Sequence, residues 1–325
     1  MSSEASVARN GVPAGLSARP WWPLATRLFT LVICVAVLGL VWMQARQMDW
    51  DAVLKAMRAY DAGTLALAAA FSLASYLTYS SFDAIGVHQL RLPVAWWRAA
   101  GIGFVSYAFN LNLGSLIGGV AMRYRLYAQA GAGLDGTTQV LALSMITNWL
   151  GHLFVGGLVF VLAPIALPAA WHLGSNGLRL VGVGMLLPVL AYVLACSFSR
   201  RREWTWRTHT LRLPSWRFAL LQLAVSSANW LLIAAILYTA MQGRIPYTAA
   251  LSALFIAAVA GVIVHVPAGL GVLEAVFVML LSSRMPKAEL LAALLAYRAI
   301  YYLLPLAVAG AVFFVLDRRR RPRGA

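Results

Sequence analysis

The sequence predicts an all-α integral membrane protein with about eight transmembrane helices plus a re-entrant hairpin. Apolar residues make up 62% of the 325 residues and charged residues only 11%, whereas a water-soluble domain needs roughly 25% charge. Apolar stretches near or above 18 residues recur along the chain, and each can cross a hydrocarbon core about 30 Å thick. Backbone amides in lipid must be satisfied within the segment, which favours helices. The alternating strands of a β-barrel are missing from the sequence.

The expected spans follow one another along the chain. They are roughly 25–44, 62–82, 137–163, 178–198, 217–241, 247–265, 268–283 and 290–316. Residues 1–27 are polar and rich in Pro, Gly and Ser, and predict a disordered cytoplasmic tail. Residues 28–317 form the predicted membrane domain, and 318–325 a basic cytoplasmic tail. No small-residue cleavage site follows the first apolar run, so we interpret that run as an uncleaved span rather than a signal peptide.

A ninth apolar stretch, about 98–120, decides the topology. Glycines interrupt it and two asparagines lie near its middle; these residues are Gly114, Gly118, Gly119, Asn110 and Asn112. If the stretch folds back as a re-entrant hairpin, 18 of the 26 Lys and Arg residues fall on one side and 7 on the other, with Arg298 inside a span. By the positive-inside rule, both termini are then cytoplasmic.

A second interruption lies between Val264 and Glu274, where a proline and two glycines separate two apolar runs: Pro267, Gly269 and Gly271. Two Gly/Pro-broken apolar segments indicate a binding site near the midplane of a transporter-like fold. The alternative is that Gly and Pro are simply commoner in membrane helices, where neighbouring groups satisfy the backbone.

Three motifs resemble a known family. They are NLNLGSLIGG from Asn110 with RYRLY from Arg123, PAGLGVLE from Pro267, and RAIYYLLP from Arg298. Together they resemble the lysylphosphatidylglycerol-synthase transmembrane-region family, over most of the chain from about Ala62 to Leu316. That family includes YbhN-type proteins of the bacterial inner membrane and the membrane half of MprF-type proteins, which resembles a flippase for aminoacylated phospholipid. The resemblance therefore implies a multi-pass protein of the bacterial inner membrane.

MprF-type proteins attach the amino acid with a separate soluble domain. The polar stretches between the expected spans are too short to hold such a domain, so the resemblance does not carry the transferase activity over to this chain. We expect no enzyme activity of that kind.

Charges within the bilayer are costly, by about 2.5–3.5 kcal/mol for a central Arg or Asp, so each one predicts a partner or a task. Glu274 and Arg298 lie in neighbouring apolar runs and are expected to pair. The pair either locks two helices together or meets a lipid headgroup, because Arg suits bidentate phosphate contact. Arg123 follows the glycine break and either contacts phosphate or anchors the chain at the interface.

The candidate substrate-binding residues share membrane depth and closeness to a break: Asn110, Asn112, Arg123, Glu274, Arg298 and Tyr302. The asparagines serve either a ligand or freed backbone groups. Two polar stripes at helical spacing also stand out, and they consist of Ser72, Tyr76, Tyr79 and Asp83, and of Ser144, Asn148 and His152. Such stripes face protein or a cavity. Asp83 is expected near the cytoplasmic end, where charge costs less.

Several activities are excluded. The sequence has no Walker A loop, nucleophile elbow, HExxH motif or dinucleotide fingerprint, and its histidines and cysteines have no metal-ligand spacing. We therefore expect no catalytic residue, cofactor or metal. The net charge of +16 comes from arginines that membrane topology explains, so we expect no nucleic-acid partner.

These features favour a flippase-like protein that binds an anionic or modified phospholipid and moves it between the leaflets of the inner membrane. Two alternatives remain open. One is a membrane-embedded lipid-modifying enzyme or synthase accessory that uses Glu274 or Asp83 as an acid or base. The other is a non-catalytic partner of an envelope protein that docks through the Arg200–Arg217 loop. The expected partners are membrane lipids, and either an envelope protein or a second copy of the chain.

Overall fold

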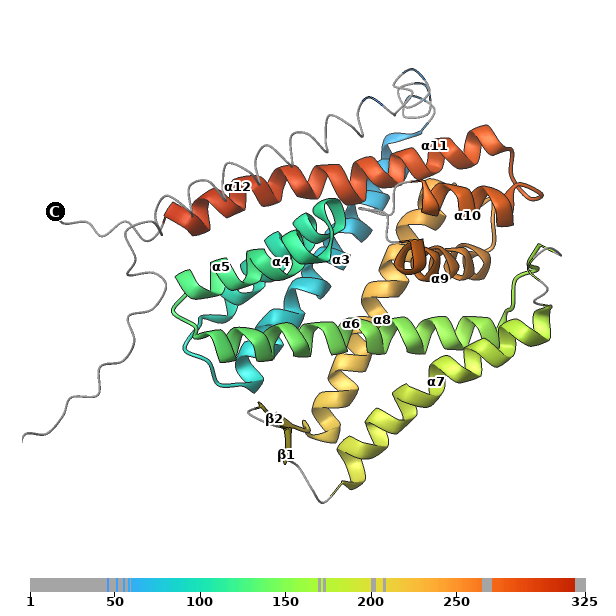
Figure 1. Cartoon of the computed structure of the whole chain (residues 1–325). Coiled ribbons are helices and arrows are strands. Elements are labelled where there is room, and N and C mark those ends of the chain that lie inside the picture. The colour runs from blue at the N-terminus through green and yellow to red at the C-terminus, as the bar shows by residue number, and fades with distance from the viewer. Residues whose placement is uncertain are drawn as a thin grey trace, which may run out of the picture. The chain divides into compact units, whose positions relative to one another are not determined.

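Helices make up most of the chain that the structure describes. The computed structural model describes residues 46, 51, 55, 58, 60–168, 171, 174–199, 203–206, 209–264 and 271–318. The expected first span at 25–44, the tails 1–27 and 319–325, and the breaks Pro267 and Gly269 lie outside these residues. The helices are labelled as in Figure 1, with η for a π-helical stretch: α3 (Ala62–Gln89), α4 (Trp96–Leu113), η2 (Ser115–Ala121), α5 (Met122–Gln129), α6 (Leu134–Leu162), α7 (Ser175–Phe198), α8 (Trp216–Ala240), α9 (Tyr247–Val264), α10 (Val272–Leu281), α11 (Lys287–Arg298), η5 (Ala299–Leu303) and α12 (Leu304–Arg318).

The helical fold is confirmed, with one small departure in the described residues. The Arg-rich loop between α7 and α8 contains two antiparallel strands, β1 (Glu203–Trp206) and β2 (His209–Arg212), in which Glu203 pairs with Arg212. The sequence analysis did not predict this hairpin, because charged and aromatic residues in a short polar loop do not show the apolar alternation of a half-buried strand.

Five helical segments of the described chain are long and apolar enough to cross a membrane. They are α3, α6, α7, α8 and the continuous segment Lys287–Leu316, which joins α11, η5 and α12. Each coincides with an expected span. The expected spans at 247–265 and 268–283 correspond to α9 and α10, which are apolar but shorter. α10 has ten residues, or about 15 Å at 1.5 Å per residue, about half of a hydrocarbon core. The number of crossings stays a prediction.

α3 is central to the packing, since it contacts α4, α6, α8 and η5. Its N-terminus is capped by Asp61, whose side chain accepts from the backbone N–H of Thr64 at 2.9 Å. α8 is capped in the same way by Ser215. Small residues set the closest helix crossings. A Cβ at Gly151 of α6 would overlap Ser226 of α8, and one at Gly157 would overlap the backbone of α7.

The glycine-broken stretch forms a helical hairpin. α4 ends at Leu113 and is followed by Gly114, whose φ of +86° and ψ of 169° are accessible to glycine almost alone. The chain then returns as η2 and α5 along α4 (Figure 1). A Cβ at Gly118 would overlap the backbone of Phe109 and Asn110, so the two legs meet backbone to backbone. Glycine at this position is what permits the close return.

The two ends of the hairpin lie at the same end of the helix bundle. Leu92, which precedes α4, contacts the position of Gly136 in the first turn of α6, and Gly86 near the end of α3 lies against Val140. The chain therefore enters the hairpin from α3 and leaves it into α6 at the same end of the helix bundle. This is the connectivity that the re-entrant prediction requires.

The second predicted interruption also separates two helices. α9 ends at Val264, and α10 begins at Val272 directly after Gly271, which has a left-handed φ of +77°. α10 packs against α9 and α11. Glu274 consequently lies in the first turn of a helix whose N-terminal end is at this break.

Candidate functional site

The π-helical stretch η5 presents backbone carbonyls to its neighbours. Pro305 has no N–H to give to the carbonyls of Ile300 or Tyr301. The hydroxyl of Ser72 donates to the Ile300 carbonyl at 3.2 Å, and that of Tyr76 donates to the Tyr301 carbonyl at 3.0 Å. Polar side chains of α3 therefore satisfy backbone groups that the proline leaves without that donor, and they fix η5 against α3.

These contacts place η5 at mid-depth along α3. Asp61 and Asp83 lie about six turns apart, or about 33 Å at 1.5 Å per residue. Ser72 and Tyr76 lie about 16–23 Å from Asp61 on the same scale. A hydrocarbon core is about 30 Å thick, which is close to the distance between Asp61 and Asp83. If α3 crosses the bilayer, η5 therefore lies near the midplane.

The predicted pair of Glu274 and Arg298 is formed beside η5. The Nε of Arg298 donates to Oε1 of Glu274, and its Nη2 donates to Oε2 at 3.0 Å. The Arg298 guanidinium also lies 5.3 Å from the centre of the Tyr302 ring, within cation–π range. The Arg298 side chain is buried, whereas that of Glu274 is 19% exposed. The pair is bidentate, and its carboxylate is the more accessible half.

The tip of the first hairpin reaches the same place. Asn112, two residues before the turn at Gly114, donates from Nδ2 to the Tyr302 carbonyl at 3.3 Å and to the Ala108 carbonyl at 2.8 Å. Its Oδ1 is buried without a hydrogen-bond partner. The two interrupted helices thus converge on η5, one through Asn112 and the other through Glu274. Four of the predicted site residues come together here: Asn112, Glu274, Arg298 and Tyr302.

A buried hydroxyl network also meets η5, at Tyr301. Ser75 donates to Oδ1 of Asn229 at 2.7 Å and is 2.9 Å from the Tyr301 hydroxyl, which is 2.9 Å from the Tyr107 hydroxyl. Tyr107 stacks on Tyr79 with ring centres 3.6 Å apart. The polar stripe on α3 predicts that this face meets protein or a cavity, and the structure places protein there. The partners on α4 and α8 are single polar residues in apolar helices, so no sequence pattern predicts them.

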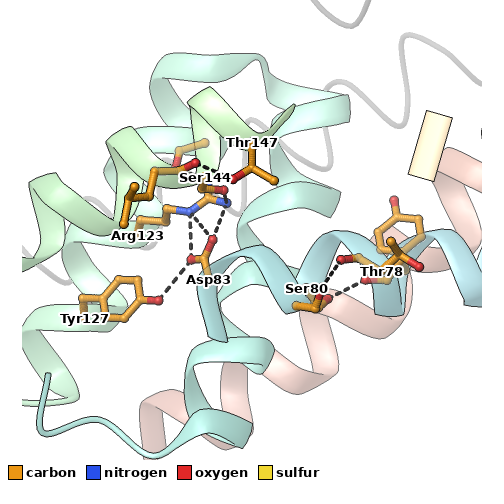
Figure 2. A network of polar contacts seen from close by, with 11 residues as sticks. Thr78, Ser80, Asp83, Arg123, Tyr127, Ser144 and Thr147 are labelled. Atoms are coloured by element: carbon orange, nitrogen blue, oxygen red, sulfur yellow. Dashed lines mark hydrogen bonds and ion pairs between the residues drawn. The ribbon is translucent and has the colours of Figure 1, made fainter. Parts of the chain in front are cut away.

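Arg123 lies in a second ion pair, shown in Figure 2. Its Nε and Nη2 donate to the carboxylate of Asp83 at 2.9–3.2 Å. Nη1 donates to the Gly119 carbonyl at 3.1 Å and Nη2 to the Ser144 hydroxyl at 3.2 Å. The Tyr127 hydroxyl donates to Asp83 at 3.1 Å. Asp83 is 0% and Arg123 2% exposed, so this network is enclosed by protein and ties α3, α5 and α6 together.

The remaining predicted residues shape the hairpin. Asn110 lies against η2, with its Oδ1 close to Gly119, and no contact places it beside Glu274. Arg123 is likewise engaged within the hairpin and its supports. Asp83, which the sequence analysis expected at a low-cost helix end, is instead fully buried, because Arg123 compensates its charge. Whether any of these residues binds a ligand stays a prediction.

The second polar stripe is occupied by helix packing. Ser144 joins the Arg123 network, and the Asn148 carbonyl accepts from Ser226 and from the indole of Trp230, each at 3.2 Å. The His152 ring packs edge-on against three aromatic rings, those of Trp149, Trp230 and Phe255. Within the described residues, no three His, Cys, Asp or Glu side chains are grouped as metal ligands.

Cavities open at the surface of the described chain, and two of them differ in their lining. One, of about 360 Å³, is an apolar groove between α6 and α7 lined by Trp149, Pro188 and Tyr192 among others. The second, of about 370 Å³, lies between the start of α3 and the end of α8. Neither is lined by Glu274 or Arg298.

The comparisons with known proteins agree with these features. The family model described as the lysylphosphatidylglycerol synthase TM region matches residues 28–309. The chain belongs to this family. The predicted resemblance is therefore confirmed, and the matched region includes both breaks, Glu274, Arg298 and the whole of η5.

Among relatives of this family, the chain is 37% identical over 303 residues to the inner membrane protein YbhN of Escherichia coli, covering 93% of the chain and 95% of that protein. It is 31% identical over 298 residues to an uncharacterized protein of Synechocystis, covering 89% and 92%. It is 25% identical to the phosphatidylglycerol lysyltransferase of Staphylococcus haemolyticus over 292 residues, which is 87% of the chain but 33% of that enzyme. As a member of this family with apolar helices, the chain is a multi-pass membrane protein.

Proposed function

We propose that the chain is a flippase-like protein that moves a phospholipid between the two leaflets of the inner membrane. One observation carries the proposal: two interrupted membrane helices converge on η5 at mid-depth along α3, one through Asn112 and the other through Glu274, which forms a bidentate pair with Arg298 beside η5. Interrupted helices that meet polar groups at the midplane are typical of transporters. A lipid headgroup needs such groups at the depth where bilayer alone offers none.

The chemistry we propose is an exchange of anionic partners on Arg298. A phosphate matches the guanidinium fork as a carboxylate does, so a phosphodiester can replace Glu274 without leaving the arginine charge uncompensated. The Tyr302 ring, 5.3 Å from the guanidinium, holds its orientation during the exchange. The Asn112 amide, with its buried Oδ1, is placed to accept a hydrogen bond from a headgroup hydroxyl.

The substrate class we propose is an anionic glycerophospholipid or its aminoacyl derivative. A family relative is named phosphatidylglycerol lysyltransferase, which makes phosphatidylglycerol the first lipid to test. The proposal includes eight crossings, a re-entrant α4–η2–α5 hairpin and cytoplasmic termini, as the arginine distribution predicts. Asn110 and Arg123 are assigned to holding the hairpin in place.

The test is leaflet exchange in liposomes that contain the purified full-length protein. We expect exchange of acyl-labelled phosphatidylglycerol above the rate of protein-free liposomes, and a decrease of at least about tenfold in Arg298→Gln, if bidentate contact contributes about 1.4 kcal/mol or more to passage. The matched control is Arg244→Gln, because Arg244 also pairs with a glutamate, Glu289, but at an exposed position. Folded wild-type protein that gives the rate of empty liposomes for every headgroup refutes the proposal.

A further inference from the structure

The cavity of about 370 Å³ between α3 and α8 differs from the apolar groove in the chemistry of its lining. Its walls combine a carboxylate, hydroxyls, a phenol ring and an amide with one apolar side chain, and they include Asp61, Thr64, Leu67, Tyr238, Thr239 and Gln242. A cavity that gathers several kinds of polar group around an aromatic ring is suited to a small polar ligand.

Asp61 supplies the charge of this cavity. Its carboxylate accepts from the Thr64 N–H at 2.9 Å and from the Thr64 hydroxyl at 2.6 Å. These hydrogen bonds lower the pKa of Asp61, so the group is ionised at neutral pH. Among the described residues no ion pair involves Asp61, and the Arg244 guanidinium in the loop after α8 is paired with Glu289. The carboxylate therefore keeps its negative charge available, which favours a cation and disfavours a phosphate.

Tyr238 supplies the aromatic surface. Its ring packs edge-on against Tyr247 with ring centres 5.8 Å apart, which fixes its orientation at the cavity wall. A carboxylate and an electron-rich ring on the walls of one cavity are a recurring arrangement for ammonium groups, since both attract a cation while the ring tolerates its methylene carbons. Leu67 adds an apolar contact for the same carbons.

The position of the cavity along α3 connects it with the lipid path. Asp61 caps the N-terminal end of α3, about 33 Å from Asp83 and about 16–23 Å from the residues that hold η5. We propose that this cavity binds the ammonium group of a phospholipid headgroup, such as an ethanolamine or aminoacyl headgroup, in the leaflet opposite to the Asp83–Arg123 pair. The inference rests on the proposed lipid-handling function and adds to it a headgroup site on the far side.

The test uses the full-length protein in detergent and titrates it with dihexanoyl-phosphatidylethanolamine or dihexanoyl-phosphatidylglycerol, both below their micelle concentrations. Asp61→Asn removes the charge and keeps the helix cap, because Asn and Asp are about equally good N-caps. We expect this variant to bind the ethanolamine lipid about fivefold more weakly and the glycerol lipid unchanged. Tyr238→Leu is expected to weaken binding of the ethanolamine lipid about threefold. The matched control is Asp51→Asn, which neutralises an exposed carboxylate that does not line the cavity.

Two results overturn the site. One is an Asp61→Asn variant that keeps wild-type affinity for the ethanolamine lipid, or loses affinity for both lipids equally. The other is free ethanolamine binding as tightly as the lipid, which excludes a lipid ligand. Leaflet exchange is measured separately. If the wild-type protein exchanges lipid no faster than empty liposomes, transport is refuted. If it exchanges lipid but Asp61→Asn leaves the affinity for the ethanolamine lipid unchanged, only the far-side site is refuted.

Discussion

The two arginine–carboxylate pairs of this protein are alike in chemistry and different in surroundings. In the Asp83–Arg123 pair, the guanidinium also bonds to Gly119 and Ser144, the carboxylate also accepts from Tyr127, and both side chains are at most 3% exposed. The Glu274–Arg298 pair adjoins a helix break, and Glu274 is 19% exposed. The Asp83–Arg123 pair is saturated by protein groups and enclosed, whereas the partly exposed carboxylate of Glu274 is the feature by which we expect the second pair to exchange partners.

The largest effect is expected from breaking the saturated pair. Asp83→Asn leaves the Arg123 charge buried without compensation, which costs about 3–5 kcal/mol. Equilibrium unfolding in mixed detergent micelles measures the loss, and Asp135→Asn, an exposed acidic residue at the start of α6, is the control. The double variant Asp83→Leu/Arg123→Met should recover much of the stability. A single variant as stable as wild type contradicts a structural role for the pair.

A substitution that disturbs the hairpin held by Arg123 should lower the free energy of unfolding nearly as much. Gly118→Ala forces a methyl group into the backbone of α4, and overpacking of this kind costs about 1–3 kcal/mol. Gly261→Ala in α9 meets nothing within 4 Å and should be neutral or slightly stabilising. Measuring the unfolding midpoints of both variants under the same conditions tests this difference. Equal midpoints would exclude the tight backbone contact at Gly118.

The exchangeable pair is expected to respond to lipid. Glu274→Gln should lose about 2 kcal/mol in detergent or zwitterionic lipid, less than Asp83→Asn because Glu274 is partly exposed. Phosphatidylglycerol should restore about half of that loss, because its phosphate can take the place of the carboxylate. The same lipid should not rescue Asp83→Asn. Rescue of both variants, or of neither, would remove the distinction between the two pairs.

The smallest effect concerns the contacts that hold η5. Tyr76→Phe removes the hydroxyl that serves the Tyr301 carbonyl and should cost about 1 kcal/mol. Adding Pro305→Ala returns a backbone N–H near that carbonyl, so the two changes together should cost less than their sum in a double-mutant cycle. Strict additivity would show that the proline and the hydroxyl are independent.

Much of this arrangement follows from local sequence, and the rest does not. Apolar length predicts the spans, and Gly and Pro predict both breaks, because each acts on the residues next to it. The Glu274–Arg298 pair was predictable because each is an isolated charge in a neighbouring apolar run. Asp83 and Arg123 are 40 residues apart. Each lies at the end of an apolar segment, where water can solvate a charge, so neither position predicts a partner within the protein. Their pairing depends on how α4 and η2 fold back.

The π-helical stretch was also beyond local prediction. The motif around Tyr301 contains a proline, which predicts a freed carbonyl but not the widened turn before it. Tyr107 and Asn229 are lone polar residues. Tyr107 meets Tyr301 directly and Asn229 is linked to it through Ser75, so α3, α4, α8 and η5 must all be positioned together. Contacts among single residues on distant helices are set by packing, and no spacing in the sequence encodes them.

The turn at η5 has a consequence for what this span tolerates. A π-helical turn fits one more residue than an α-helical turn, and each residue of a regular helix rotates the chain by about 100°. Deleting one residue between 299 and 303 would make the span regular and turn α12 by about a quarter of a revolution relative to α11. The face that packs on α4 would then no longer point the right way while Arg298 still faces Glu274. We therefore expect single-residue deletions in this segment to be tolerated less well than most substitutions, since one added residue sets the angle between its two halves.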